Sequence, residues 1–213
     1  MNHFVGLCFG DNWENDLEYY YEGLDVEPYI RYTKEEAIKK AKEYHVSNCE
    51  YAAKQLALDT LSLEQLNHYN DIVNGGCFLS DEEAWESVQD WGYQIDDEGN
   101  LLSTYNPDSK WDWYSIGGRW SGFLPLKELD SEGDHLTTNE ARVGEIDWEY
   151  LLNEKFPPFC FVTEDGEWIE KGEMGWWGVS FNEQPASDWT TQFKDYLSTL
   201  DSNCLVTVID FHI

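Results

Sequence analysis

Two apolar segments at the ends of the chain decide its fold: HFVGLCF at residues 3–9 and CLVTVIDFHI at residues 204–213. Both are short and almost continuously apolar, which is typical of strands in the middle of a sheet. A strand this apolar stays in solution only when it pairs inside a sheet. We therefore predict that strands 3–9 and 204–212 lie together near the sheet centre.

Polar residues predict where three helices begin in the first half of the chain. Thr33 and Glu36 have the spacing of a capping box, which opens a helix over about residues 34–58. Ser62 and Ser80 precede two shorter helical patterns, and the second has acids in its first turn, where the helix dipole favours them.

These elements predict an α+β fold with a mostly antiparallel sheet. We expect the helices at 34–58 and 187–200 to pack on one face of that sheet. A length of 213 residues suits a single domain over residues 1–213. The helical, acidic segment at about 34–92 is a candidate subdomain.

Two acidic clusters that end in glycine predict hairpin turns, at residues 96–99 and 164–166. Neither fits the spacing of a calcium-binding loop, so we expect no metal there. The polar stretch 127–144 is predicted to be a loop.

The charge is extreme, with 43 acids against 13 bases and a net charge of -30. Such a surface repels the phosphate backbone of nucleic acids and anionic membranes, whereas it attracts and steers a basic protein. The alternative is that the charge only keeps an aromatic-rich chain soluble. The acids proposed to face a partner are Asp81, Glu82, Glu83, Glu86, Asp90, Asp96, Asp97 and Glu98.

The cysteines are five in number and include no CxxC pair. Met1 leads straight into a strand-like segment without a signal-peptide pattern, and no apolar run approaches 18 residues. These features predict a chain that works in a reducing, cytoplasmic compartment and does not span a membrane.

The most unusual segment is NPDSKWDWYSIGGRWSGFLPL at residues 106–126. If residues 110–116 are extended, Trp111 and Trp113 point to the same side. One interpretation is a pocket or contact patch with an aromatic floor and cations that hold an anion. The other is a structural cluster in which Asp112 and Arg119 form an internal ion pair. The candidate binding residues are Lys110, Trp111, Asp112, Trp113, Tyr114, Arg119 and Trp120.

This segment resembles a family of uncharacterised bacteriophage and prophage proteins that share the signature NPxxKWDWYxxGGRW. The matching residues are Asn106, Pro107, Lys110, Trp111, Asp112, Trp113, Tyr114, Gly117, Gly118, Arg119 and Trp120. The resemblance extends to HFVGLCFG, VEPYIRYTKEEAI, GEIDWE and VIDFHI, and so spans most of the chain. It implies a phage-encoded accessory protein and does not imply a reaction.

One further polar group lies near the chain ends. Asp210 and His212 share a face of the last strand, and His3 is expected on the neighbouring strand. With a carboxylate from elsewhere they could bind a transition metal or transfer protons. The alternative, which we adopt, is that they are hydrogen-bonded polar residues at the end of the sheet. We expect no catalytic residue, metal or cofactor, because no nucleophile motif or nucleotide-binding motif is present.

Three functions therefore stay open. The leading hypothesis is an inhibitor of a host defence protein, of the anti-CRISPR or anti-restriction type, that occupies a basic nucleic-acid-binding surface. The second is a protein that binds a nucleotide-like small molecule through residues 110–120. The third is an enzyme with a histidine–aspartate site.

Overall fold

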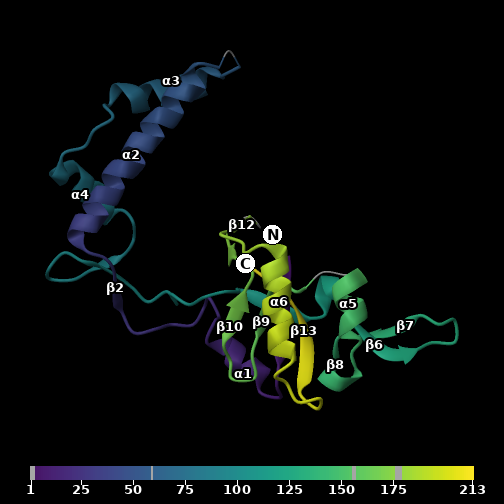
Figure 1. Ribbon diagram of the computed structural model, residues 1–213. Coiled ribbons are helices and arrows are strands. Elements are labelled where there is room, and N and C mark those ends of the chain that lie inside the picture. The colour runs from purple at the N-terminus through teal and green to yellow at the C-terminus, as the bar shows by residue number, and fades with distance from the viewer. Residues whose placement is uncertain (1–2, 59, 155–156, 176–178) are drawn as a thin grey trace. The chain divides into compact units, whose positions relative to one another are not determined.

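The computed structural model describes residues 3–58, 60–154, 157–175 and 179–213 (Figure 1). Its internal contacts divide the chain into two compact units. Unit 1 consists of Met1–Asp25 and Tyr105–Ile213, and unit 2 is Val26–Thr104. Unit 2 contains the whole helical segment 34–92.

A mixed sheet forms the centre of unit 1, in the strand order β10-β9-β1-β13-β5, and β8 also pairs with β13. β1 (His3–Phe9) and β13 (Leu205–His212) pair antiparallel, from His3 opposite His212 to Phe9 opposite Val206. The predicted α+β fold with central end strands is confirmed. The other strands of this sheet are β5 (Trp113–Ile116), β8 (Glu140–Arg142), β9 (Cys160–Val162) and β10 (Trp168–Glu170).

One face of the sheet is buried under α6 (Ala186–Leu197), which lies beside the sheet in Figure 1. Alternation along β1 sends Leu7 and Phe9 to this face, where they share one core with Trp189 and Phe193 of α6. These four side chains are at most 1% exposed, and complete burial of each contributes roughly 2–3 kcal/mol. α5 (Trp148–Glu154) adds Leu151 to the same core.

The opposite face is covered by α1 (Trp13–Glu18), so helices lie on both faces of the sheet. Trp13 and Leu17 pack there against Phe4 and Phe211. Phe4 and Phe211 stack with their ring centroids 5.4 Å apart.

Short hairpins and turns complete unit 1. β6 (Leu124–Leu129) pairs with β7 (His135–Thr138), and β11 (Glu173–Met174) pairs with β12 (Ser180–Phe181). Residues 127–144 were predicted to be a loop, which is wrong because β7 and β8 both lie there. The 3-10 helices are η1 (Gly118–Trp120) and η2 (Val143–Glu145).

Unit 2 contains helices and a three-stranded sheet of order β2-β4-β3. The helices begin after Thr33, Ser62 and Ser80, as predicted. Each start has a reciprocal capping box, which the sequence predicted only for Thr33 with Glu36. The elements are α2 (Lys34–Leu56), α3 (Leu63–Asn74), α4 (Asp81–Gln89), β2 (Tyr29–Tyr32), β3 (Gln94–Ile95) and β4 (Leu101–Ser103).

The fully buried part of the core of unit 2 consists mainly of small side chains, with larger side chains packed around it at partial burial. Ala37 and Ala41 of α2 pack with Ala84 and Val88 of α4 and with Leu101 of β4. The helix that was expected on the large sheet therefore buries its narrow alanine stripe inside unit 2, against the equally small face of α4.

The turn between β3 and β4 is the predicted hairpin turn. Asp96 accepts hydrogen bonds from the backbone N–H groups of Glu98 and Asn100, over 2.9 and 2.8 Å. Gly99 has a φ of +88°, a conformation that side chains with a Cβ rarely adopt.

Candidate functional site

The aromatic segment 110–120 does not form one surface. β5 begins only at Trp113, so Trp111 lies ahead of the strand, in an isolated bridge with Tyr21. The Trp111 indole is 8% exposed and donates to the Leu17 carbonyl over 3.1 Å, whereas Trp113 is 43% exposed. The expectation that these two tryptophans point the same way is therefore wrong.

Tyr114 and Trp120 are also separated by the sheet. Tyr114 packs in the core below α1, and burial is the main cause that raises the pKa of its hydroxyl. Trp120, in η1, is half-buried against the core below α6. The predicted aromatic floor is thus divided between two faces.

The two cations of the segment have different surroundings. Lys110 Nζ forms an ion pair with Glu170 Oε1 over 2.7 Å. The Arg119 side chain is exposed, and its backbone N–H donates to Asp210 Oδ2 over 2.9 Å. Asp112, the suggested ion-pair partner of Arg119, is engaged by a histidine instead. Lys110 lines a cavity together with Glu170, and Arg119 is not among the lining residues of that cavity.

Four polar residues at the end of the sheet form what we call the paired His–Asp centre: His3, Asp112, Asp210 and His212. The Nδ1 atom of His3 lies 2.8 Å from Asp210 Oδ1. The Nδ1 atom of His212 lies 2.6 Å from Asp112 Oδ1. The sequence suggested three of these residues, and the structure supplies Asp112 as the carboxylate from elsewhere.

The backbone after β5 is shaped to hold Asp210. Asp210 Oδ2 accepts a hydrogen bond from the Arg119 backbone N–H. Gly118, with a φ of +46°, lies against the Asp210 side chain. A Cβ on Gly118 would sit 2.3 Å from Asp210 Oδ2, so only glycine fits. Trp113 closes the other side of the centre by stacking on His212, with ring centroids 5.1 Å apart.

The chemistry open to this centre is limited by burial. The side chains of His3 and Asp210 are 6% and 3% exposed, so a dissolved substrate has little access to them. His212 Nε2 is buried without a hydrogen-bond partner among the described atoms. Within the part of the chain that the structure describes, no three His, Cys, Asp or Glu side chains are arranged to hold a metal ion. The contacts themselves link β1, β13 and the chain before β5.

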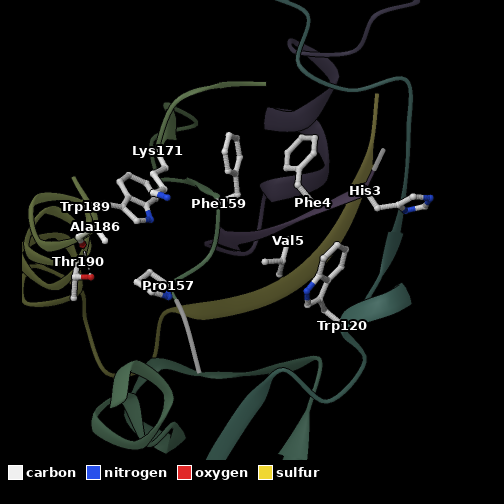
Figure 2. A pocket seen from close by; sticks show the side chains of 10 residues that line it. All are labelled: His3, Phe4, Val5, Trp120, Pro157, Phe159, Lys171, Ala186, Trp189 and Thr190. Carbon is white, nitrogen blue, oxygen red and sulfur yellow. Dashed lines mark hydrogen bonds between the residues drawn. The ribbon is translucent and has the colours of Figure 1, made fainter. Parts of the chain in front are cut away.

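A cavity of about 380 Å³ lies beside this centre, between β1 and α6 (Figure 2). Figure 2 shows Trp189 and Lys171 at one end and Trp120 and His3 at the other, with the His3 ring directed away from the cavity. The lining residues are His3, Phe4, Val5, Trp120, Pro157, Phe159, Lys171, Ala186, Trp189 and Thr190. The lining is mostly apolar, and its permanently charged residue is Lys171. The Lys171 side chain forms an ion pair with Glu183.

Most of this lining could not be predicted. Of the segment 110–120 only Trp120 takes part. Phe159, Lys171 and Trp189 come from three separate stretches of sequence, so no local spacing connects them. Lys110 lines a different cavity of about 210 Å³ together with Glu170.

The predicted acidic surface lies in unit 2, on α4 and on the turn before β4. Seven of its eight side chains are exposed, and Asp96 is half-buried because it organises the turn. Hydrogen bonds from Ser80 lower the pKa of Glu83, and hydrogen bonds from Asn100 lower the pKa of Asp96. Both carboxylates are therefore charged at neutral pH.

The chain matches no known protein family, no characterised protein and no solved structure. No helix in the described residues combines the length and the apolar character that crossing a membrane requires. The function is therefore inferred from the residues and contacts of the chain itself.

Proposed function

We propose that this chain is a phage-encoded acidic accessory protein that inhibits a host defence protein by occupying its basic, nucleic-acid-binding surface. The partner class is a CRISPR effector or a restriction enzyme, met in the cytoplasm of the infected cell. In this proposal the chain acts as a mimic of DNA and does not bind nucleic acid directly. The observation that carries the proposal is the exposed line of carboxylates on α4.

The geometry of that line suits electrostatic docking. Glu82 and Glu86 of α4 and its C-cap residue Asp90 follow one another at intervals of four residues. They therefore lie on one side of the helix, about 6 Å apart along its axis. Asp97, in the turn between β3 and β4, is a further exposed acid of unit 2. Charges of one sign on an exposed face raise association rates with a basic partner and repel polyanions.

A variant that neutralises this surface tests the proposal. The substitutions are Glu82→Gln, Glu86→Gln, Asp90→Asn and Asp97→Asn, at exposed positions outside the capping box and the turn hydrogen bonds. Host lysate is passed over the immobilised wild-type chain and over this variant at low and at high salt. We expect one basic protein to be retained by the wild type at low salt and lost from the variant.

A matched control removes the same charge from unit 1: Glu128→Gln, Glu132→Gln, Asp134→Asn and Glu149→Gln, all exposed. This control is expected to retain the partner. Equal loss from both variants would show that only total charge matters and would contradict a docking surface on unit 2.

A second candidate function is supported by the cavity below α6: binding of a small, flat, nucleotide-like molecule. Its four aromatic rings favour a planar ligand, and Lys171 could contact an anionic group. The sequence placed such a site at residues 110–120, whereas the cavity includes only Trp120 of that segment.

Ligand binding is tested by the melting temperature of the chain in the presence of ATP, NAD and cyclic dinucleotides. A ligand at one hundred times its dissociation constant stabilises the folded state by about 2.7 kcal/mol. Trp120→Ala should abolish the shift, and Trp113→Ala, which is outside the cavity lining, should keep it. A shift that survives Trp120→Ala would place the ligand elsewhere.

A further inference from the structure

Two thiols meet in unit 2 although they are 28 positions apart in the sequence. Cys49 lies on α2 with 1% of its surface exposed, and Cys77 lies in the loop between α3 and α4. Contacts join α3 to α2, and Figure 1 shows the two helices side by side. This packing brings the loop after α3 back to the middle of α2.

The contacts of Cys49 fix the position of that loop. Its Sγ lies 3.6 Å from the Gly76 carbonyl oxygen and 3.9 Å from the Ile72 carbonyl oxygen. His45, one turn earlier on α2, has its Nε2 atom 2.8 Å from the same Gly76 oxygen. A carbonyl only accepts, so His45 Nε2 is the donor, and two side chains of α2 hold the residue next to Cys77.

The Cys77 side chain also affects the protonation of Cys49. A hydrogen bond with the Cys77 side chain is the largest cause, ahead of burial, that raises the pKa of Cys49 to about 11. Cys49 is therefore a protonated thiol at neutral pH. Cys77 is half-buried, so a reagent in solution reaches its sulfur more readily.

We propose that Cys49 and Cys77 form a redox-active dithiol that is oxidised to a reversible disulfide by low-molecular-weight disulfides such as oxidised glutathione. The Cys77 thiolate attacks one glutathione sulfur, so its S–S bond breaks and one glutathione thiolate leaves. Cys49 then loses its proton to solvent and attacks Cys77 Sγ, which expels the second glutathione thiolate. The protein dithiol loses two electrons and two protons, and one oxidised glutathione becomes two reduced molecules.

The unreactive cysteines provide an internal comparison. Cys8 and Cys160 are fully buried in unit 1, and burial raises the pKa of both thiols well above the usual value. Burial also raises the pKa of Cys204, to about 11. A thiol that stays protonated and covered reacts poorly with a reagent in solution. Cys49 is equally covered, so in this proposal it attacks only the neighbouring Cys77 sulfur and not glutathione itself. The proposal is independent of the docking function, because it concerns the interior of unit 2.

The test incubates the purified full chain with oxidised glutathione and follows intact mass and peptide maps under non-reducing conditions. The wild type should lose two hydrogens and give one cross-linked peptide pair, Cys49 with Cys77. Cys49→Ser should stop at a glutathione adduct on Cys77, and Cys77→Ser should not react. Cys204→Ser, the matched control, should behave as the wild type.

A second measurement uses only the wild type, so its result does not depend on whether the cysteine variants fold. The wild-type disulfide should raise the melting temperature of unit 2 by about 5 °C or more, because it cross-links a long stretch of chain. Reduced glutathione should reverse both changes. The proposal is overturned if the wild type keeps five alkylatable thiols, if it accumulates a stable glutathione adduct, or if Cys77→Ser forms a disulfide.

Discussion

Unit 1 and unit 2 differ in where they place their acidic groups. Unit 1 carries 27 acids and seven bases, and it draws some of its carboxylates into the structure, as in the paired His–Asp centre and the Lys110–Glu170 pair. Unit 2 has the smaller surplus of acids, yet its acids on α4 stay exposed. In the proposed function, the placement of carboxylates, more than their number, determines where a partner docks.

The cores of the two units differ in the size of their buried side chains. Large aromatic rings such as Phe9, Phe161 and Trp189 fill the core below α6. In unit 2 the completely buried side chains are mostly alanines, so each helix gains less from burial. Local interactions such as helix capping therefore contribute a larger share of the stability of unit 2 than of unit 1.

The largest effect is expected when the aromatic core of unit 1 is opened. Trp189 is 1% exposed, and its indole N–H donates to the Pro158 carbonyl over 2.8 Å. Trp189→Ala should lower the free energy of unfolding of unit 1 by about 3–5 kcal/mol, measured by denaturant titration. Tyr44→Ala, at a side chain that is 72% exposed, should change stability by less than about 0.5 kcal/mol.

In the paired His–Asp centre, substitution of the more deeply buried aspartate should cost more stability. Asp210→Asn removes a buried charge that accepts from two donors, and we expect a loss of about 2–3 kcal/mol in unfolding free energy. Asp112→Asn should cost roughly 1 kcal/mol, because the Asp112 side chain is 35% exposed. Denaturant titration measures both losses. Equal losses of unfolding free energy in the two variants would contradict the view that the His3–Asp210 pair contributes more to stability than the His212–Asp112 pair.

Substitution of an N-cap residue tests how much helix capping stabilises unit 2. Ser80→Ala removes the side chain that accepts the Glu83 N–H, and it should destabilise α4 by about 1 kcal/mol. Hydrogen exchange of the α4 amides would measure this loss. The control Ser131→Ala lies in an exposed turn of unit 1 and should leave the same amides unchanged.

The smallest effect is a pH dependence at Glu83. Hydrogen bonds from Ser80 lower its pKa in the folded state below the ordinary value of 4.5. The charged form therefore adds stability above pH 4.5, and this contribution disappears as pH falls through the lowered pKa. In thermal melts, wild type should exceed Glu83→Gln at neutral pH and equal it in strong acid. A difference that grows on acidification would reverse the assigned sign.

The sequence predicted those features that depend on local spacing. The apolar patterns of residues 3–9 and 204–212 located the sheet centre, and Thr33, Ser62 and Ser80 located three helix starts. Apart from the pairing of the two end strands, features that depend on long-range pairing were missed. The polar segment 127–144 becomes β7 and β8 only because neighbouring strands supply its hydrogen bonds.

The candidate sites show the same limit. Alternation along β13 correctly placed Asp210 and His212 on one face, but nothing local joined Asp112 to His212. Alternation failed at Trp111, because the strand starts two residues later and the preceding chain turns toward α1. The acidic residues of α4 were easier, since charged side chains at successive turns rarely lie inside a small core.

The most direct test of the account is the affinity of the chain for its captured partner across a series of salt concentrations. The wild type and the variant with Glu82, Glu86, Asp90 and Asp97 neutralised would be compared by calorimetry. We expect the variant to bind at least about tenfold more weakly at low salt and the two affinities to converge as salt rises. Equal affinities at every salt concentration would contradict the claim that the exposed carboxylates of unit 2 select the partner.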